Sequence, residues 1–196
     1  LTAATGMDAL THAIEGYITK GHCTISDMFH LEAIKLISEN LRGAVQNTPE
    51  GREGMALGQY IAGMGFSNVG LGIVHSMAHP LGAHYDTPHG VANALLLPYV
   101  MEYNAESPAA PKYMQIAKAM GVNTEGMTEA EGVRAAVDAV RQLSLSIGIP
   151  QKLHEIGVRE EDLHQLAIDA FNDVCTGGNP RPTSVEDIEA LYRKAF

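Results

Sequence analysis

The chain has 196 residues, and 45% of them are hydrophobic, which is enough to fill the core of one domain. A formal net charge of −10 argues against sequence-independent binding to nucleic acid, because such binding needs a basic surface. No stretch has the length of an apolar membrane span, and the N-terminus lacks the pattern of a signal peptide. Cys23 and Cys175 fit no disulfide framework or CxxC motif. We therefore expect a cytoplasmic protein that binds neither nucleic acid nor a membrane.

Hydrophobic residues recur at helical spacing along most of the chain, and capping residues, glycines and prolines separate the segments. No segment shows the alternation that is typical of a strand. The sequence therefore predicts one all-α domain over residues 1–196, built as an irregular multi-helix bundle. The expected helices cover residues 2–18, 26–42, 50–67, 91–103, 111–120, 128–147, 160–174 and 184–196.

Residues 50–67 are unusually rich in glycine, alanine and methionine. Small side chains at helical spacing let a neighbouring helix come close, so we expect this segment to be buried at the centre of the bundle. The glycines of residues 65–72 (GFSNVGLG) lack the GxGxxG order, and no strand precedes them. They are therefore not interpreted as a dinucleotide-binding fingerprint.

Four histidines lie between positions 75 and 89, in an apolar and glycine-rich stretch. His75 and His79 are four residues apart, so a helical turn places them on one face. Pro80 disturbs the helix after His79, and the prolines and glycines that follow allow a turn to bring His89 back toward the same point. Neutral imidazole is a common metal ligand, and three or four convergent ligands fix a divalent ion. The stretch therefore predicts part of a metal site.

A second candidate ligand pair lies near the start of the chain. Asp8 and His12 are also four residues apart, within the first predicted helix. One carboxylate with two or three imidazoles suits Fe²⁺, Zn²⁺ or another first-row divalent ion better than Mg²⁺ or Ca²⁺, and it leaves a position free for substrate. The alternative interpretation of such a pair is a polar helix face. Taken together, the two regions favour a metal site.

The remaining histidines are interpreted differently. His84 stands beside Tyr85 and Asp86 at an expected loop edge, so we expect it outside the metal site. The histidines among polar residues are expected at the surface: His22, His30, His154 and His164.

Three motifs, TGMDALTHAIEGY, MGFSNVGLGIVHSMAHPLGAHYDTPHGVANALLLPYV and DVCTGGNPR, resemble the C-terminal half of the iron-dependent (group III) alcohol dehydrogenases. The resemblance covers residues 1–196. Members of this family carry an N-terminal α/β domain with the nucleotide site, followed by a helical domain. The sequence enters a predicted ligand-bearing helix directly after Leu1, so we expect it to be a piece of a longer protein whose nucleotide domain is absent.

The resemblance implies roles for the candidate residues. His79 would lie beside the metal, near the nicotinamide and the substrate. Phe66 would line the substrate pocket next to the cofactor, and Cys175 would lie close to the site. By default, Cys175 is a small buried apolar residue rather than a nucleophile. The implied metal ligands are Asp8, His12, His75 and His89.

The implied activity is that of an NAD(P)-dependent alcohol dehydrogenase, which interconverts a small aldehyde and an alcohol or diol of the lactaldehyde and 1,2-propanediol type. Fe²⁺, or Zn²⁺ with the same ligands, would act as a Lewis acid. His79 would either relay the proton or orient a metal ligand. We expect a homo-oligomer for the full-length enzyme, and an inactive protein for this half alone.

Two other classes fit the residues without the resemblance. A metal-dependent hydrolase also uses mixed Asp and His ligands, and it would hydrolyse phosphoesters or amides without nicotinamide. In a non-catalytic helical module, the histidines would pack or bind partners, and folding would survive chelation of metal.

Overall fold

The computed structural model describes all of residues 1–196, and it contains helices and no strand, as the sequence predicts. No helix is both long enough and apolar enough to cross a membrane. The α-helices are α1 (Thr2–Ile18), α2 (Thr24–Val45), α3 (Pro49–Phe66), α4 (Ile73–Tyr85), α5 (His89–Asn104), α6 (Tyr113–Ala119), α7 (Glu129–Ser146), α8 (Leu163–Phe171) and α9 (Val185–Ala195). Four short 3₁₀ helices lie between them: η1 (Ala110–Lys112), η2 (Leu153–Ile156), η3 (Glu160–Asp162) and η4 (Val174–Gly178).

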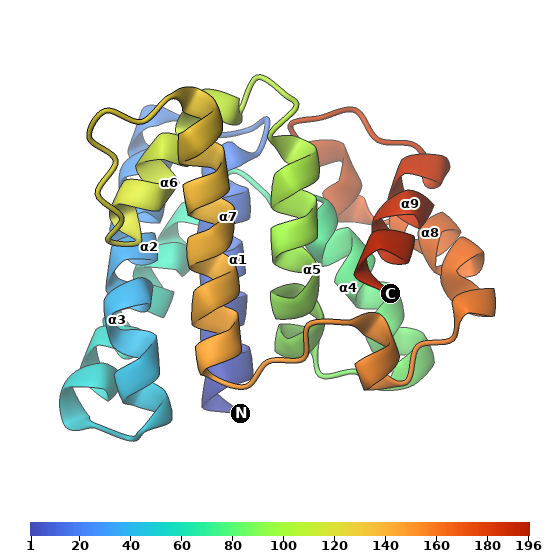
Figure 1. Cartoon of the computed structure of the whole chain (residues 1–196), viewed down its shortest axis with the longest axis horizontal. Helices are drawn as coiled ribbons and strands as arrows, with labels where there is room; N and C mark the ends of the chain where they lie inside the picture. The colour runs from blue at the N-terminus through green and yellow to red at the C-terminus, as the bar shows by residue number, and fades with distance from the viewer.

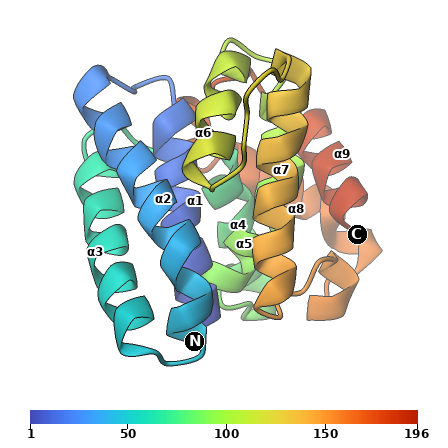
Figure 2. The ribbon, with the colours of Figure 1, turned by 60° about the vertical axis from the view of Figure 1, so that its left-hand side comes forward.

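Helix α1 is the element that joins the two sides of the bundle. The hairpin of α2 and α3 packs on one side of α1, and α5 packs on the other (Figure 1). Helix α4 then contacts α5, and α8 and α9 lie beyond it (Figure 1). Helices α6 and α7 form a further pair that contacts both α2 and α5 (Figure 2). A single apolar cluster runs through these contacts, so one hydrophobic core holds α1 and α4 in place.

Helix α3 lies at the edge of the bundle, and the expectation that residues 50–67 form its centre is wrong (Figure 2). The outer face of α3 is exposed at Leu57 and Tyr60, whereas Gly58 and Gly65 are buried against α2. A Cβ on Gly58 would lie 3.0 Å from Ile37 Cγ1. The small residues therefore allow α2 and α3 to pack closely, and this contact buries only one face of α3.

Helix α4 continues through Pro80, so the prediction of a break after His79 needs correction. The helix runs on to Tyr85 and ends at Asp86, whose φ of 53° is left-handed. Asp tolerates this conformation better than most residues, and the turn that follows leads directly into His89, the first residue of α5. The two histidine-bearing helices are therefore joined by a short, sharp connection.

The predicted helix over residues 160–174 is divided in the structure. It becomes η3, α8 and then η4, with α8 ending at Phe171. The Asp173 carboxylate accepts the backbone N–H of Cys175 at 2.8 Å, which starts η4 instead of a further turn of α8. This turn places Asp173 against α4, because η4 and α4 are in contact.

Candidate metal centre

Three helices bring the predicted ligands together. Asp8 and His12 project from one face of α1, with His12 Nδ1 3.9 Å from Asp8 Oδ1. His75 comes from the first turn of α4, and His89 begins α5. The ligand atoms of Asp8, His75 and His89 all lie within 4.8 Å of one another, which is a spacing that a single ion can bridge.

The separations between ligand atoms fit a metal ion. His75 Nε2 lies 3.6 Å and His89 Nε2 3.5 Å from Asp8 Oδ1, and His75 Nε2 lies 3.2 Å from His12 Nε2. Donors held tetrahedrally at ordinary metal–ligand lengths are about 3.3–3.5 Å apart. His12 lies at the edge of the group, because it is not among the three residues whose ligand atoms all lie within 4.8 Å of one another. The residues present therefore fit a first-row divalent ion.

Exposure increases from one side of this group to the other. The side chain of His75 is only 2% exposed, whereas that of His89 is 44% exposed. Asp8 and His12 are intermediate. A bound ion would therefore be anchored on the buried His75 side and accessible from the His89 side, as a site that keeps a position for substrate requires.

Asp8, His12 and His89 are in the protonation states that bind a metal. Burial raises the pKa of the Asp8 carboxyl, but the His75, His12 and His89 rings lower it by more, so the net pKa is lowered. Burial, with the charge of His75, lowers the pKa of His12 to about 4. Burial lowers the pKa of His89 as well. Asp8 is therefore a carboxylate, and His12 and His89 are neutral imidazoles, at neutral pH.

His75 behaves in the opposite way. Burial alone would lower its pKa, yet the hydrogen bonds and charges of Asp8 and Glu15 raise it to about 9. A positive charge is thus stabilised at His75 Nε2, between two carboxylates. A metal ion bound at that nitrogen would replace the proton, which is the usual competition at such sites.

Glu15 is a functional candidate that the sequence reasoning missed. Its carboxylate lies 2.6 Å from His75 Nδ1 and is almost fully buried. It lies on α1, in the same motif as Asp8 and His12, and three residues after His12. That spacing puts Glu15 and His12 on neighbouring faces of the helix, and it was the available signal.

Asn93 was also missed. Its Nδ2 donates to Asp8 Oδ1 at 2.7 Å and lies 3.0 Å from His89 Nε2, and its side chain is fully buried in α5. Its position four residues after His89 places both on one face of α5. Asn93 therefore links two candidate ligands that come from different helices.

His79 lies beside the group and has its own partner. His79 Nδ1 is 2.7 Å from Asp173 Oδ2, and the ring stacks on that of His89 with centroids 5.4 Å apart and an interplanar angle of 15°. Burial raises the pKa of the Asp173 carboxyl, but the Cys175 N–H and His79 lower it by more, so Asp173 stays charged. The ring of His79 is therefore held at the accessible side of the site.

Phe66 and Cys175 lie on different sides of the ligands. The Phe66 ring stacks on His12 with centroids 4.2 Å apart, and it lines a groove of about 610 Å³ between α1 and α3 that also reaches Asp8. Cys175 lies next to Asp173, outside that groove. Burial, with the charge of Asp173, raises the pKa of the Cys175 thiol to about 12, so the thiol is neutral and a poor nucleophile.

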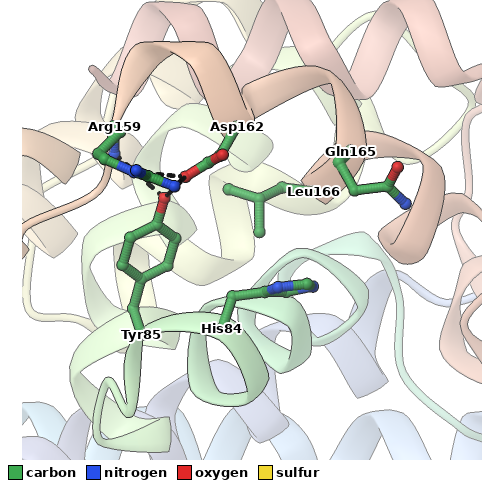
Figure 3. Close-up of a pocket in the computed structure, with 6 residues that line it drawn as sticks. All are labelled: His84, Tyr85, Arg159, Asp162, Gln165 and Leu166. Atoms are coloured by element: carbon green, nitrogen blue, oxygen red, sulfur yellow. Dashed lines mark hydrogen bonds and ion pairs between the residues drawn. The ribbon is translucent and has the colours of Figure 1, made fainter.

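His84 lies apart from the ligands, as expected. Its Nε2 is 2.8 Å from Asp169 Oδ2, and it lines a separate cavity of about 300 Å³ together with Tyr85 and Arg159 (Figure 3). In this cavity the Arg159 guanidinium and the Tyr85 hydroxyl both bond to Asp162 (Figure 3). The other polar side chains that line it, His84 and Gln165, bond to Asp169, so the polar groups are all paired and this cavity is not the candidate site.

His30 is buried, and its assignment to the surface is wrong. Both ring nitrogens lack a hydrogen-bond partner, and the ring lies between the backbones of Gly16 and Gly65. Burial lowers the pKa of His30 to about 4, so the ring is a neutral core residue. The other three histidines assigned to the surface, His22, His154 and His164, are exposed.

Comparison with known proteins identifies a matching family and similar relatives. A family model described as the Fe-containing alcohol dehydrogenase family, C-terminal, matches residues 2–196. The chain is 59% identical over 196 residues to the lactaldehyde reductase of Escherichia coli (strain K12), covering 100% of the chain and 51% of that protein. It is 46% identical over 198 residues to the 1,3-propanediol dehydrogenase of Klebsiella pneumoniae, again covering 100% of the chain and 51% of that protein.

A solved structure agrees with the fold. The crystal structure of a 1,3-propanediol oxidoreductase matches with a TM-score of 0.98 and 46% identity, over 100% of this chain and 52% of that one. The chain thus spans about half the length of the relatives that it matches. The all-α fold and the family resemblance are confirmed.

Proposed function

This chain belongs to the Fe-containing alcohol dehydrogenase family, of which it forms the C-terminal part, and we propose that it is the metal-binding half of an NAD(P)-dependent alcohol dehydrogenase. The proposed reaction interconverts a small aldehyde and the corresponding alcohol or diol. The observation that carries the proposal is the convergence of Asp8, His75 and His89 from three separate helices, with His12 beside them.

The proposed metal is Fe²⁺, after the family, and Zn²⁺ is the alternative that the same donors accept. When bound, the ion supplies a Lewis acid that polarises the substrate oxygen and stabilises the negative charge developing there. This chain's own part is to hold the ion and to keep one side of it accessible. The proposed ligands are Asp8, His12, His75 and His89.

His79 is the proposed proton-transfer residue. The carboxylate of Asp173 holds its Nδ1, so its Nε2 is the nitrogen that remains to exchange a proton with the substrate oxygen, directly or through a hydroxyl or water. The alternative role for His79 is to orient the site by stacking on His89. In either role, His79 would act from the accessible side of the site, where a nicotinamide would lie.

Phe66 and Cys175 are proposed to shape the pocket. The Phe66 ring provides an apolar wall beside His12, against which a nicotinamide ring or a short carbon chain would pack. The neutral Cys175 thiol would act as a small apolar group, behind Asp173.

The proposed substrate pair is lactaldehyde and 1,2-propanediol, because the relative named for that reaction is 59% identical over the whole chain. 1,3-Propanediol is the second candidate, from the relative that is 46% identical. We further propose that NAD(P) binds mainly to the half of the protein that precedes this one in its relatives, and that the full-length enzyme is a cytoplasmic homo-oligomer.

The test uses the full-length protein purified without oxygen. We expect it to reduce lactaldehyde with NADH, and we expect His75→Ala to abolish this activity. His84→Ala is the matched control, because His84 lies on the same helix and outside the site. Full activity in His75→Ala would refute the proposal, and hydrolysis of phosphoesters without nicotinamide would support the metal-dependent hydrolase instead.

A further inference from the structure

We propose that Glu15 is a positioning residue that fixes the register of α1 against α4 and thereby sets the affinity of the site for its metal ion. This inference rests on the metal site of the proposed function. Glu15 does not need to touch the ion. It acts through His75, which is the most buried of the candidate ligands.

The carboxylate of Glu15 caps α4 from another helix. Gly72 is the N-cap residue of α4 and has no side chain with which to bond the free N–H groups of the first turn. Glu15 Oε1 accepts the N–H of Val74 at 2.7 Å, and Glu15 Oε2 accepts the N–H of His75 at 3.4 Å. The negative charge also suits the positive end of the helix. One side chain of α1 therefore bonds two of the free N–H groups at the start of α4, and Asn179 Oδ1 accepts that of Ile73 at 3.4 Å.

The same carboxylate selects the form of His75 that binds a metal. Glu15 Oε2 lies 2.6 Å from His75 Nδ1, and an ionised carboxylate only accepts hydrogen bonds. His75 Nδ1 must therefore carry the hydrogen, so the lone pair of neutral His75 is on Nε2. That nitrogen is the one that faces Asp8 and His12. A carboxylate that orients a metal-binding histidine in this way is a common feature of metal sites.

The burial of Glu15 supports a specific role. Its side chain is 2% exposed, and His75 is its only ion-pair partner, since no Lys or Arg bonds to it. A buried carboxylate without a basic partner is costly unless hydrogen bonds and a nearby cation offset the cost. The N–H groups in the first turn of α4 and His75 Nδ1 supply the hydrogen bonds, and a bound ion would supply the nearby positive charge. Because Asp8 and His12 lie on the same helix as Glu15, this contact aligns Asp8 and His12 with His75.

The direct test is Glu15→Gln in the full-length protein. Val74 N–H and His75 Nδ1 bond different oxygens of Glu15. The amide of Gln has only one oxygen, so its NH₂ group must face one of these two donors, and where it faces His75 it favours the wrong tautomer. We expect the affinities for Fe²⁺ and Zn²⁺, measured by competition with a chelator, to fall about 10- to 100-fold. Glu32→Gln, an exposed site on α2, is the control and should keep the wild-type affinity.

A second variant tests the same idea without changing a charge. A Cβ on Gly72 would lie 3.0 Å from Glu15 Oε1 and 3.0 Å from Asn179 Oδ1, so Gly72→Ala should displace the carboxylate slightly. We expect weaker metal binding, by a smaller factor than for Glu15→Gln. Gly82→Ala on the same helix meets only Thr87 O at 3.6 Å and should bind metal normally.

Thermal unfolding separates a positioning role from a merely structural one. We expect the rise in Tm on adding Zn²⁺ to shrink in Glu15→Gln and Gly72→Ala relative to their controls. Unchanged metal affinity and an unchanged rise in Tm in both variants would overturn the inference. If wild type bound no metal at all, the proposed function would fail instead, so the two failures are distinguishable.

Discussion

Asp173 lies 2.7 Å from His79 Nδ1 although the two residues are 94 positions apart in the chain. The contact joins η4 to α4 and is reinforced by the Cys175 N–H, which the same carboxylate accepts. Because a carboxylate accepts hydrogen bonds, it fixes the hydrogen of neutral His79 on Nδ1. The other ring nitrogen then has a defined direction, beside the ring of His89.

Asp173→Asn in the full-length protein should therefore impair turnover and leave the metal in place. We expect kcat to fall about 10- to 100-fold, since the orientation of a proton-transfer group is lost while the ligands are untouched. Asp169→Asn is the matched control, because Asp169 bonds to His84 outside the site. Loss of metal in Asp173→Asn would show instead that Asp173 holds the site together, and an unchanged kcat would remove its role altogether.

The buried His30 predicts a specific pH dependence of stability. Burial lowers its pKa to about 4 in the folded state, so the unfolded chain, with a pKa near 6.5, binds the proton first. The protonation of His30 therefore does not affect the free energy of unfolding above about pH 6.5. As the pH falls toward 4, protonation of the unfolded chain lowers this free energy by up to about 3 kcal/mol. Asp27 and Lys112 are the charged groups that act on the ring.

Urea unfolding of the full-length protein at several pH values measures this effect. Wild type should lose free energy of unfolding more steeply than His30→Gln between pH 6.5 and 4. The exposed His164→Gln should follow wild type. Equal slopes for wild type and His30→Gln would mean that the pKa of His30 does not change on folding, which would contradict this account.

Two glycines of α3 should respond to the same substitution with opposite signs. A Cβ on Gly65 would overlap the buried His30 ring, so Gly65→Ala should destabilise the fold by about 1–3 kcal/mol. A Cβ on Gly63 would meet nothing within 4 Å, so Gly63→Ala should stabilise by about 0.5–1 kcal/mol through helix propensity. Free energies of unfolding measure both, and a stabilising Gly65→Ala would contradict the close packing of α2 on α3.

The helices were predictable because their signals are local. Apolar residues at helical spacing and the separating glycines and prolines were enough to place α1 and α7 nearly residue by residue. The pairs of Asp8 with His12 and of His75 with His79 were equally visible, because residues four apart share a helical face. Local spacing thus identified candidate residues on α1 and α4.

The partners of those residues were not predictable, because they depend on tertiary contacts. Glu15 meets His75 across 60 positions, and Asn93 meets Asp8 across 85. A polar residue with one distant partner has no periodic signal. His30 looked like a surface residue for the same reason, since its burial depends on glycines in α1 and α3 rather than on its own neighbours. Small residues in α3 indicated a close contact but not which side of the helix would make it.

The central claim is that Asp8, His12, His75 and His89 bind one ion, and elemental analysis of the full-length protein purified without oxygen tests it most directly. We predict about one iron or zinc ion per chain in wild type and in the control His84→Ala. Asp8→Ala and His75→Ala should contain almost none, and circular dichroism should show that each variant is folded. Metal content equal to that of wild type in both of these ligand variants would contradict the account.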